Sequence, residues 1–263
     1  MKIVEPNVFL VGETKLNKEG FDSFLNEIGV PNWFSDGKSE AEVIVEGAGK
    51  LCYMSFDTSL NQNLTKTGTR TNFDYIQEGL IGQKHTSVLE HVSINLVLTN
   101  VSRVFTHELV RHRPGAAYSQ TSGRYVRTDE LSFWIPSCIK ENPALEVLFT
   151  QAIIAQEVFL REMVKVAGLD EMTGRGDFAK KKVLTSAFRR IIGNGVANHI
   201  EATYNHRALR HIIAMRTSRH AEEEIRLVFN KVYGLVRDRY PAIYADAKAT
   251  LVDGHYEIKF SDS

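Results

Sequence analysis

The feature that most constrains the fold is a central stretch in which a two-residue period gives way to a helical one. Val92, Ile94, Leu96 and Leu98 alternate with other residues, as is typical of a β-strand. From residue 102 to residue 111 the apolar side chains recur at helical spacing instead. Helical patterns dominate elsewhere, and strands are the minority. We therefore expect an α+β fold, a single helix-rich domain with a small sheet.

Capping and turn residues predict where several elements begin. A helix is expected over residues 72–82, and another over 142–167, where Asn142 and Pro143 suit its first turn. A further helix is expected over 177–192. Asn205 and Ser218 are suitable caps for the two helices that follow. Segments 61–71 and 114–125 are polar or broken by Pro-Gly, so both are predicted to be loops.

Composition limits the class of protein. The chain has 263 residues, 43% of them hydrophobic, which is enough for one sizeable core. Lys and Arg together number 32, as do Asp and Glu, whereas proteins that bind nucleic-acid backbones usually carry a basic excess. Cys52 and Cys138 offer neither a disulfide framework nor a metal spacing. No apolar run approaches the roughly 20 residues that span a bilayer, and the N-terminus is a poor signal peptide. We expect a cytoplasmic protein, or one made in a host cytoplasm by a virus.

The most chemically distinctive segment of the chain is residues 111–125, RHRPGAAYSQTSGRY. Guanidinium groups offer paired donors that suit phosphate oxygens and keep their charge. The Ser122-Gly123 pair lets backbone N–H groups approach an anion closely. The segment therefore predicts a phosphate site. From these residues alone, a solvated face of arginines paired with acids stays open as the alternative.

The residues before this segment resemble a zinc-protease helix but lack its spacing. His107 and Glu108 begin an HExxH-like run, yet position 111 is Arg and the next histidine is His112. One extra residue places His112 about 100° further round the helix, away from the face that zinc requires. We predict no metal site.

The segment resembles the signature of flavin-dependent thymidylate synthases, which is RHR, a spacer, and then Ser-x-Arg-Tyr. The spacer here is eight residues, one longer than the commonest family form. Similar blocks occur in the family's order at residues 54–57, 85–91, 189–192, 203–207, 216 and 220–226. Gly193 stands where the family usually has Pro, and Glu222 where it usually has Gln. Together the blocks extend over roughly residues 50–220, which makes the resemblance specific.

The resemblance implies an activity and an assembly. It implies one catalytic domain over residues 1–263, with a variable section at 1–50 and the matched core at 51–240. The implied enzyme is a methyltransferase that converts dUMP to dTMP, with methylenetetrahydrofolate as carbon donor and NADPH-reduced FAD as the source of hydride. It needs no cysteine nucleophile. It also implies a homotetramer with active sites at subunit interfaces, and no nucleic-acid or membrane partner.

The resemblance also assigns roles to individual residues. The catalytic residue is Arg216, placed at the uracil edge, where a cation stabilises charge as C5 becomes nucleophilic. We call the implied dUMP-binding residues the nucleotide set: Glu108, Arg111, Gln120, Thr121, Ser122, Gly123, Arg124, Arg189 and Arg216. We call the implied FAD-binding residues the flavin set: Ser55, His85, Ser87, Arg111, His112, Arg113, Gln120, Asn205, Arg207 and His211.

Two other functions compete with this interpretation. One is a nucleic-acid-binding module that uses Arg111, Arg113, Arg124 and Arg127, against which the zero net charge argues. The other is a flavin- or nucleotide-binding relative that has lost catalysis and serves as a sensor, against which the presence of Arg216, Arg189 and Ser122 argues. A nucleophilic Ser122 is disfavoured because no histidine lies beside it in sequence to act as its base.

Overall fold

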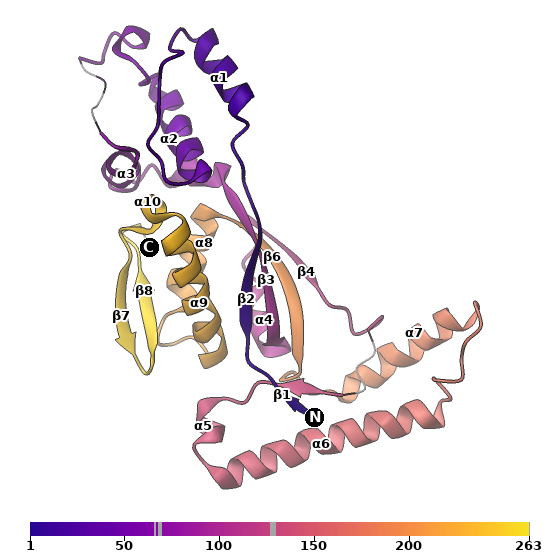
Figure 1. The fold of residues 1–263 in the computed structure, drawn as a ribbon. Coiled ribbons are helices and arrows are strands. Elements are labelled where there is room, and N and C mark those ends of the chain that lie inside the picture. Colours follow the sequence, from indigo (N-terminus) through magenta and orange to yellow (C-terminus); the bar gives the residue numbers. More distant parts are fainter. Residues whose placement is uncertain (66, 68–69, 127–129, 263) are drawn as a thin grey trace. The chain divides into compact units, whose positions relative to one another are not determined.

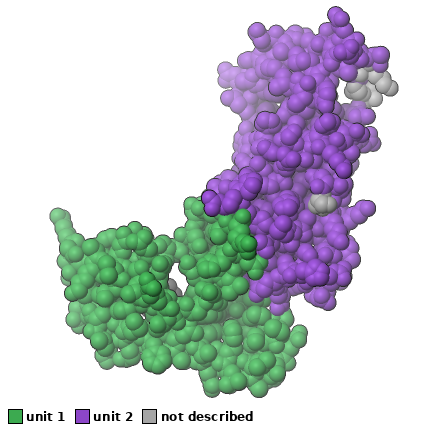
Figure 2. Space-filling view, turned by 180° about the vertical axis from the view of Figure 1, so that it is seen from behind, with its two compact units in different colours: residues 1–9, 97–111, 118–202 green, residues 10–96, 112–117, 203–263 purple. Residues whose placement is uncertain are grey.

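The computed structural model describes residues 1–65, 67, 70–126 and 130–262 (Figure 1). Part of the predicted 61–71 loop, and Arg127 of the nucleic-acid alternative, lie outside the described residues. The chain divides into two compact units, coloured separately in Figure 2. Unit 1 comprises Met1–Phe9, Val97–Arg111 and Tyr118–Ala202, and unit 2 comprises Leu10–Leu96, His112–Ala117 and Thr203–Ser263.

The largest sheet has four strands in the order β2, β3, β6, β4. Their bounds are β2 Asn7–Glu13, β3 Ser93–Ser102, β6 Ala197–Asn205 and β4 Ala116–Gln120. Val92, Ile94, Leu96 and Leu98, whose alternation predicted a strand, are all fully buried at or within β3. With helices as the majority element, the predicted α+β fold with a small sheet is confirmed.

Strand β4 corrects the prediction of a loop over residues 114–125. Gly115 has a φ of +66° and turns the chain. Its carbonyl accepts from the Asn205 N–H at 2.9 Å, and the Thr121 N–H donates to the His199 carbonyl at 3.0 Å. The intervening residues 116–120 alternate between partly buried and exposed positions. Backbone pairing along β6 thus makes a strand from short polar residues whose own propensity suggests a loop.

Unit 1 contains the long helix α6 and the shorter helices around it. Its helices are α4 Arg103–Leu109, α5 Ser137–Lys140, α6 Pro143–Val166 and α7 Asp177–Phe188, followed by the 3₁₀ turn η4 Arg189–Ile191. Strand β1 Lys2–Ile3 pairs in parallel with β5 Ser132–Phe133. Asn142 Oδ1 accepts the Ala144 and Leu145 N–H groups, so the predicted start of α6 is confirmed. The helix predicted over 177–192 is also confirmed, apart from its last residues.

Helix α6 is apolar on the side that faces solvent as well as on the side that packs. Ile153 and Leu160 are buried within unit 1, whereas Phe159 is 64% exposed and Leu148 is 62% exposed. By length and composition alone this helix could cross a membrane, which the sequence analysis did not expect. A group of large apolar side chains exposed in this way is typical of a surface that another molecule covers.

Unit 2 contains the remaining helices and a C-terminal hairpin. Their bounds are α1 Lys18–Glu27, α2 Glu40–Tyr53, η1 Thr58–Leu60, α3 Asn72–Asp74, η2 Tyr75–Ile81, η3 Thr86–His91, α8 His206–Arg216, α9 Glu223–Arg239, α10 Pro241–Tyr244, β7 Lys248–Val252 and β8 His255–Lys259. The helix predicted over 72–82 is present as α3 and η2, although η2 is π-helical. Asn205 caps α8 as predicted, accepting from the Ala208 N–H at 2.8 Å.

The predicted cap at Ser218 is wrong. Helix α9 begins at Glu223, and its N-cap residue, Glu222, makes no side-chain capping bond. Ser218 Oγ instead accepts the His220 N–H in the turn after α8. A serine in a turn can bond the backbone two residues ahead as well as it can cap a helix, and sequence does not separate the two uses.

Candidate active site

Apart from Arg216, the nucleotide set lies entirely in unit 1. Glu108 is on α4, Arg111 follows it, Gln120 ends β4 and Thr121 begins the Ser-Gly-Arg loop. Gln120 Nε2 donates to Thr106 Oγ1 at 3.0 Å, and Asn198 Nδ2 donates to the Thr121 carbonyl at 3.3 Å. These bonds to α4 and β6 hold the start of the loop in place.

A cavity of about 300 Å³ lies beside this loop. Thr121, Gly123 and Arg189 of the nucleotide set line it. A Cβ added to Gly123 would lie 3.4 Å from Arg189 Cδ, so the loop backbone and the arginine stem are in contact. The structure therefore brings the Gly123 loop and the distant Arg189 to one cavity.

Two further arginines line the same cavity and were not singled out from the sequence. They are Arg103, the first residue of α4, and Arg190. Within the described part of the chain, neither these two nor Arg189 forms an ion pair. Arg190 was visible as the neighbour of Arg189 in the RRII block, whereas Arg103 carried no motif. Three guanidinium groups around one cavity create a strongly anion-attracting site.

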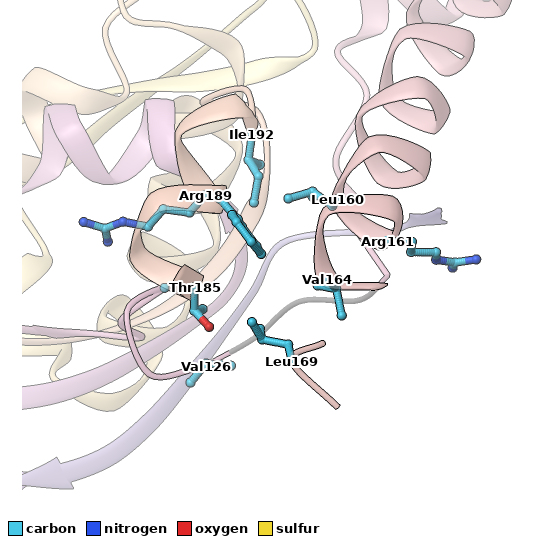
Figure 3. Close-up of a pocket in the computed structure, with 10 residues that line it drawn as sticks. Val126, Leu160, Arg161, Val164, Leu169, Thr185, Arg189 and Ile192 are labelled. Carbon is cyan, nitrogen blue, oxygen red and sulfur yellow. The ribbon is translucent and has the colours of Figure 1, made fainter. Parts of the chain in front are cut away.

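An apolar pocket explains how Arg189 is oriented. The pocket, about 50 Å³, is lined by Leu160, Val164, Leu169 and Ile192 among others. Figure 3 shows the guanidinium of Arg189 pointing away from these side chains. Arg189 also lines the neighbouring polar cavity. Its stem thus packs on apolar surface while its charged group remains available to an anion.

Most of the flavin set, together with Arg216, lies in unit 2. Arg216 Nε donates to His112 Nε2 at 2.8 Å, so this nitrogen of His112 is the acceptor. The ring of His211 lies edge-on to that of His112, with centroids 6.4 Å apart. His211 and Arg216 also line an open cavity of about 570 Å³ with His220 and Lys259. The structure thus brings His112, His211 and Arg216 together.

Gly115 and Asn205 form a tight backbone contact in the same unit. A Cβ added to Gly115 would lie 2.5 Å from Asn205 Nδ2, and the positive φ of Gly115 also favours glycine. Asn205 therefore caps α8 on one side and packs against bare backbone on the other. Its side chain is fixed before any ligand arrives.

The remaining members of the flavin set lie elsewhere in the two units. Ser55, His85 and Ser87 do not line the cavity of His211 and Arg216. The exposed His85 has Nε2 3.3 Å from Tyr53 Oη, and Arg207 is paired with Glu90. Arg111 and Gln120, which the resemblance assigns to both ligands, belong to unit 1, whereas the exposed Arg113 belongs to unit 2.

Comparisons with known proteins identify the family of this chain. Residues 36–242 match the family described as "Thymidylate synthase complementing protein". The flavin-dependent thymidylate synthase of Mycobacterium avium (strain 104) is 34% identical over 232 residues, which are 88% of this chain and 89% of that protein. Its counterpart in Mycobacterium sp. (strain KMS) is 36% identical over 228 residues, 84% of this chain and 86% of that one.

A solved structure shares the fold at low sequence identity. It is the crystal structure of the UMP/dUMP methylase PolB from Streptomyces cacaoi bound with 5-Br dUMP. The TM-score is 0.66 with 15% identity, and the alignment covers 93% of this chain and 96% of that one. This likeness confirms the architecture.

The chain belongs to the family of thymidylate synthase complementing proteins. The activity is that of a flavin-dependent thymidylate synthase, a methyltransferase that forms dTMP from dUMP. FAD as cofactor follows from this membership, as do methylenetetrahydrofolate as carbon donor and NADPH as reductant. The sequence predictions of family, function, enzyme class and cofactor are confirmed.

Proposed function

We propose that the nucleotide set binds dUMP with its phosphate in the three-arginine cavity of unit 1. The observation that supports this is the convergence of Arg103, Arg189 and Arg190 on a cavity whose wall includes Gly123. A phosphate dianion needs several donors and a positive field, and bare glycine backbone permits a close approach. Arg103 and Arg190 thereby extend the nucleotide set.

The residues in unit 2 fit a bound flavin. Their donor set combines the two edge-on imidazoles of His112 and His211, the Arg113 guanidinium and the fixed amide of Asn205. Gly115 leaves bare backbone beside Asn205, where any larger residue would collide. Polar donors beside bare backbone suit a large planar cofactor that carries phosphates. When bound, reduced FAD supplies the electrons for the methylation.

Arg216 is the proposed catalytic residue. The resemblance places its guanidinium at the uracil edge of dUMP, where it would stabilise negative charge that develops as C5 becomes nucleophilic. The acceptor at His112 Nε2 holds the guanidinium by its Nε atom.

We also propose that the protein is a homotetramer in the cytoplasm, or in a host cytoplasm, with active sites at subunit interfaces. The exposed apolar face of α6 supports self-association, since a second copy would remove it from water. On α7, Phe178 and Val183 are also more than half exposed. A second copy of this chain, rather than a membrane, is the proposed cover.

The first experiment is a visible spectrum of the purified protein, followed by anaerobic addition of NADPH with and without dUMP. We expect the absorbance of oxidised flavin, bleached faster when dUMP is present. The Arg103→Gln and Arg190→Gln variants should require severalfold more dUMP for this acceleration, whereas Arg237→Gln, an exposed arginine on α9, should not. Equal dUMP requirements in all three variants would refute the phosphate assignment while leaving the flavin assignment intact.

A further inference from the structure

The C-terminal hairpin lies beyond the part of the chain that the family match covers. The match ends at residue 242, and the hairpin consists of β7 and β8 over residues 248–259. Its two strands pair from Lys248 with Lys259 to Val252 with His255. Asp253 and Gly254 at the turn have φ values of 50° and 77°, as a tight hairpin turn requires. The hairpin is therefore a regular element whose purpose the family motifs do not explain.

The hairpin is joined to the end of α8 by a buried hydrogen bond. The Ile258 N–H donates to Thr217 Oγ1 at 2.9 Å, and Thr217 Oγ1 donates to the Ile213 carbonyl at 2.8 Å. Thr217 and Ile258 are fully buried. One threonine hydroxyl thus links β8 to the last turn of α8, and it uses both its donor and its acceptor capacity.

Thr217 is adjacent to Arg216 and is the C-cap residue of α8. A second contact lies just beyond it, because the Glu257 carboxylate accepts from both the N–H and the guanidinium of Arg219 at 3.4 Å. Glu257 and Lys259 of β8 also line the cavity that contains His211 and Arg216. Strand β8 therefore contacts the backbone on the C-terminal side of Arg216 and forms a wall of its cavity.

We propose that the C-terminal hairpin positions Arg216 through Thr217. A helix end normally frays, because its last carbonyls have no partner within the helix. The bond from Ile258 to Thr217 ties this end of α8 to β8, one residue after the arginine that the resemblance makes catalytic. Thr217 is a positioning residue, because among the described residues its hydroxyl bonds only backbone groups of the helix and the hairpin. The inference rests on the proposed role of Arg216.

The test replaces the hydroxyl and leaves the shape almost unchanged. Thr217→Val removes both hydrogen bonds, whereas Thr217→Ser keeps the hydroxyl that makes them. Thr250→Val is the control, because it makes the same chemical change on the exposed strand β7. Turnover is measured per bound FAD, well below each variant's melting temperature, so that loss of folded protein does not count as loss of activity. We expect Thr217→Val to lose about tenfold or more in kcat per bound FAD, since small misplacements at a reacting centre are costly. Thr217→Ser and Thr250→Val should stay close to the parent.

The outcomes separate this inference from the function on which it rests. Equal kcat per bound FAD in Thr217→Val and the parent would overturn the positioning role, as would a Thr217→Ser variant no better than Thr217→Val. Arg216→Ala is measured alongside. If it kept normal turnover, the role of Arg216 itself would fall. If it were inactive while Thr217→Val was normal, only the role of the hairpin would fall.

Discussion

Arg216 is the site residue to which we assign a catalytic role, whereas the other members of the nucleotide and flavin sets are assigned to binding. Its bond to His112 orients a cation that the proposed reaction uses to stabilise developing charge. We expect Arg216→Ala to lower kcat by roughly 10² or more, as removal of one charge-stabilising donor does elsewhere. FAD content should persist, because Arg216 is not a member of the flavin set and all members of that set remain. Release of tritium from 5-tritiated dUMP and flavin absorbance measure the two effects. Near-normal tritium release would contradict the assignment.

His206 makes stability depend on pH. Burial first, and then the neighbouring Arg210 charge, lower the pKa of His206 from 6.5 to about 3, while Nδ1 lies 2.8 Å from Tyr244 Oη. The native imidazole is therefore neutral, whereas the unfolded one takes up a proton below about pH 6.5. This stability is present above pH 6.5 and is lost as pH falls towards 3, by up to ~1.4 kcal/mol per pH unit.

The free energy of unfolding, measured in urea between pH 7 and pH 5, should fall accordingly. In the folded protein, NMR should show the His206 ring still neutral at pH 5. A protonated ring at that pH would refute the explanation, even if stability declined for other reasons.

At the scale of elements, the turn before β4 depends on Gly115. Alanine there would meet Asn205 Nδ2 at 2.5 Å and disturb the cap of α8. We expect Gly115→Ala to lower the free energy of unfolding by roughly 1–3 kcal/mol, because backbone strain and the lost cap add. Gly254→Ala is the matched control, since it has φ +77° but no atom within 4 Å of the added Cβ. Urea denaturation of both variants should show the larger loss for Gly115→Ala. Equal losses in the two variants would mean that the backbone strain of a positive φ, and not the collision with Asn205, determines the loss of stability.

Elements whose own residues show a capping motif or a periodicity were predictable from the sequence. Elements that form only by pairing with a distant segment were not. The capping residues Asn142 and Asn205 predicted the starts of α6 and α8, and the alternation around Leu96 predicted β3. Strand β4 was missed because its pairing with β6 depends on residues about 80 positions away. The site divides in the same way. Motifs identified Arg189, but Arg103 reaches the same cavity only through folding.

At the scale of the whole molecule, charge is balanced overall and concentrated locally. Lys and Arg equal Asp and Glu in number, yet three arginines line one cavity of unit 1. Binding a free nucleotide requires a local positive field and no extended basic surface. Binding the backbone of a nucleic-acid polymer requires an extended basic surface. The neutral composition and the arginine cavity therefore both fit a free nucleotide as the substrate.

The exposed apolar face of α6 provides the last prediction, which concerns assembly. Phe159 is 64% exposed on α6, about 100° round the helix from the buried Leu160. If a second copy covers this face, Phe159→Glu would bury an unpaired charge in each interface and should dissociate the tetramer. Leu251→Glu places the same charge on an equally exposed residue, 63%, of the C-terminal hairpin. Sedimentation velocity should show smaller particles for Phe159→Glu only. If the parent is already a fully active monomer, both the tetramer and the shared active site are refuted, and the face must have another cover.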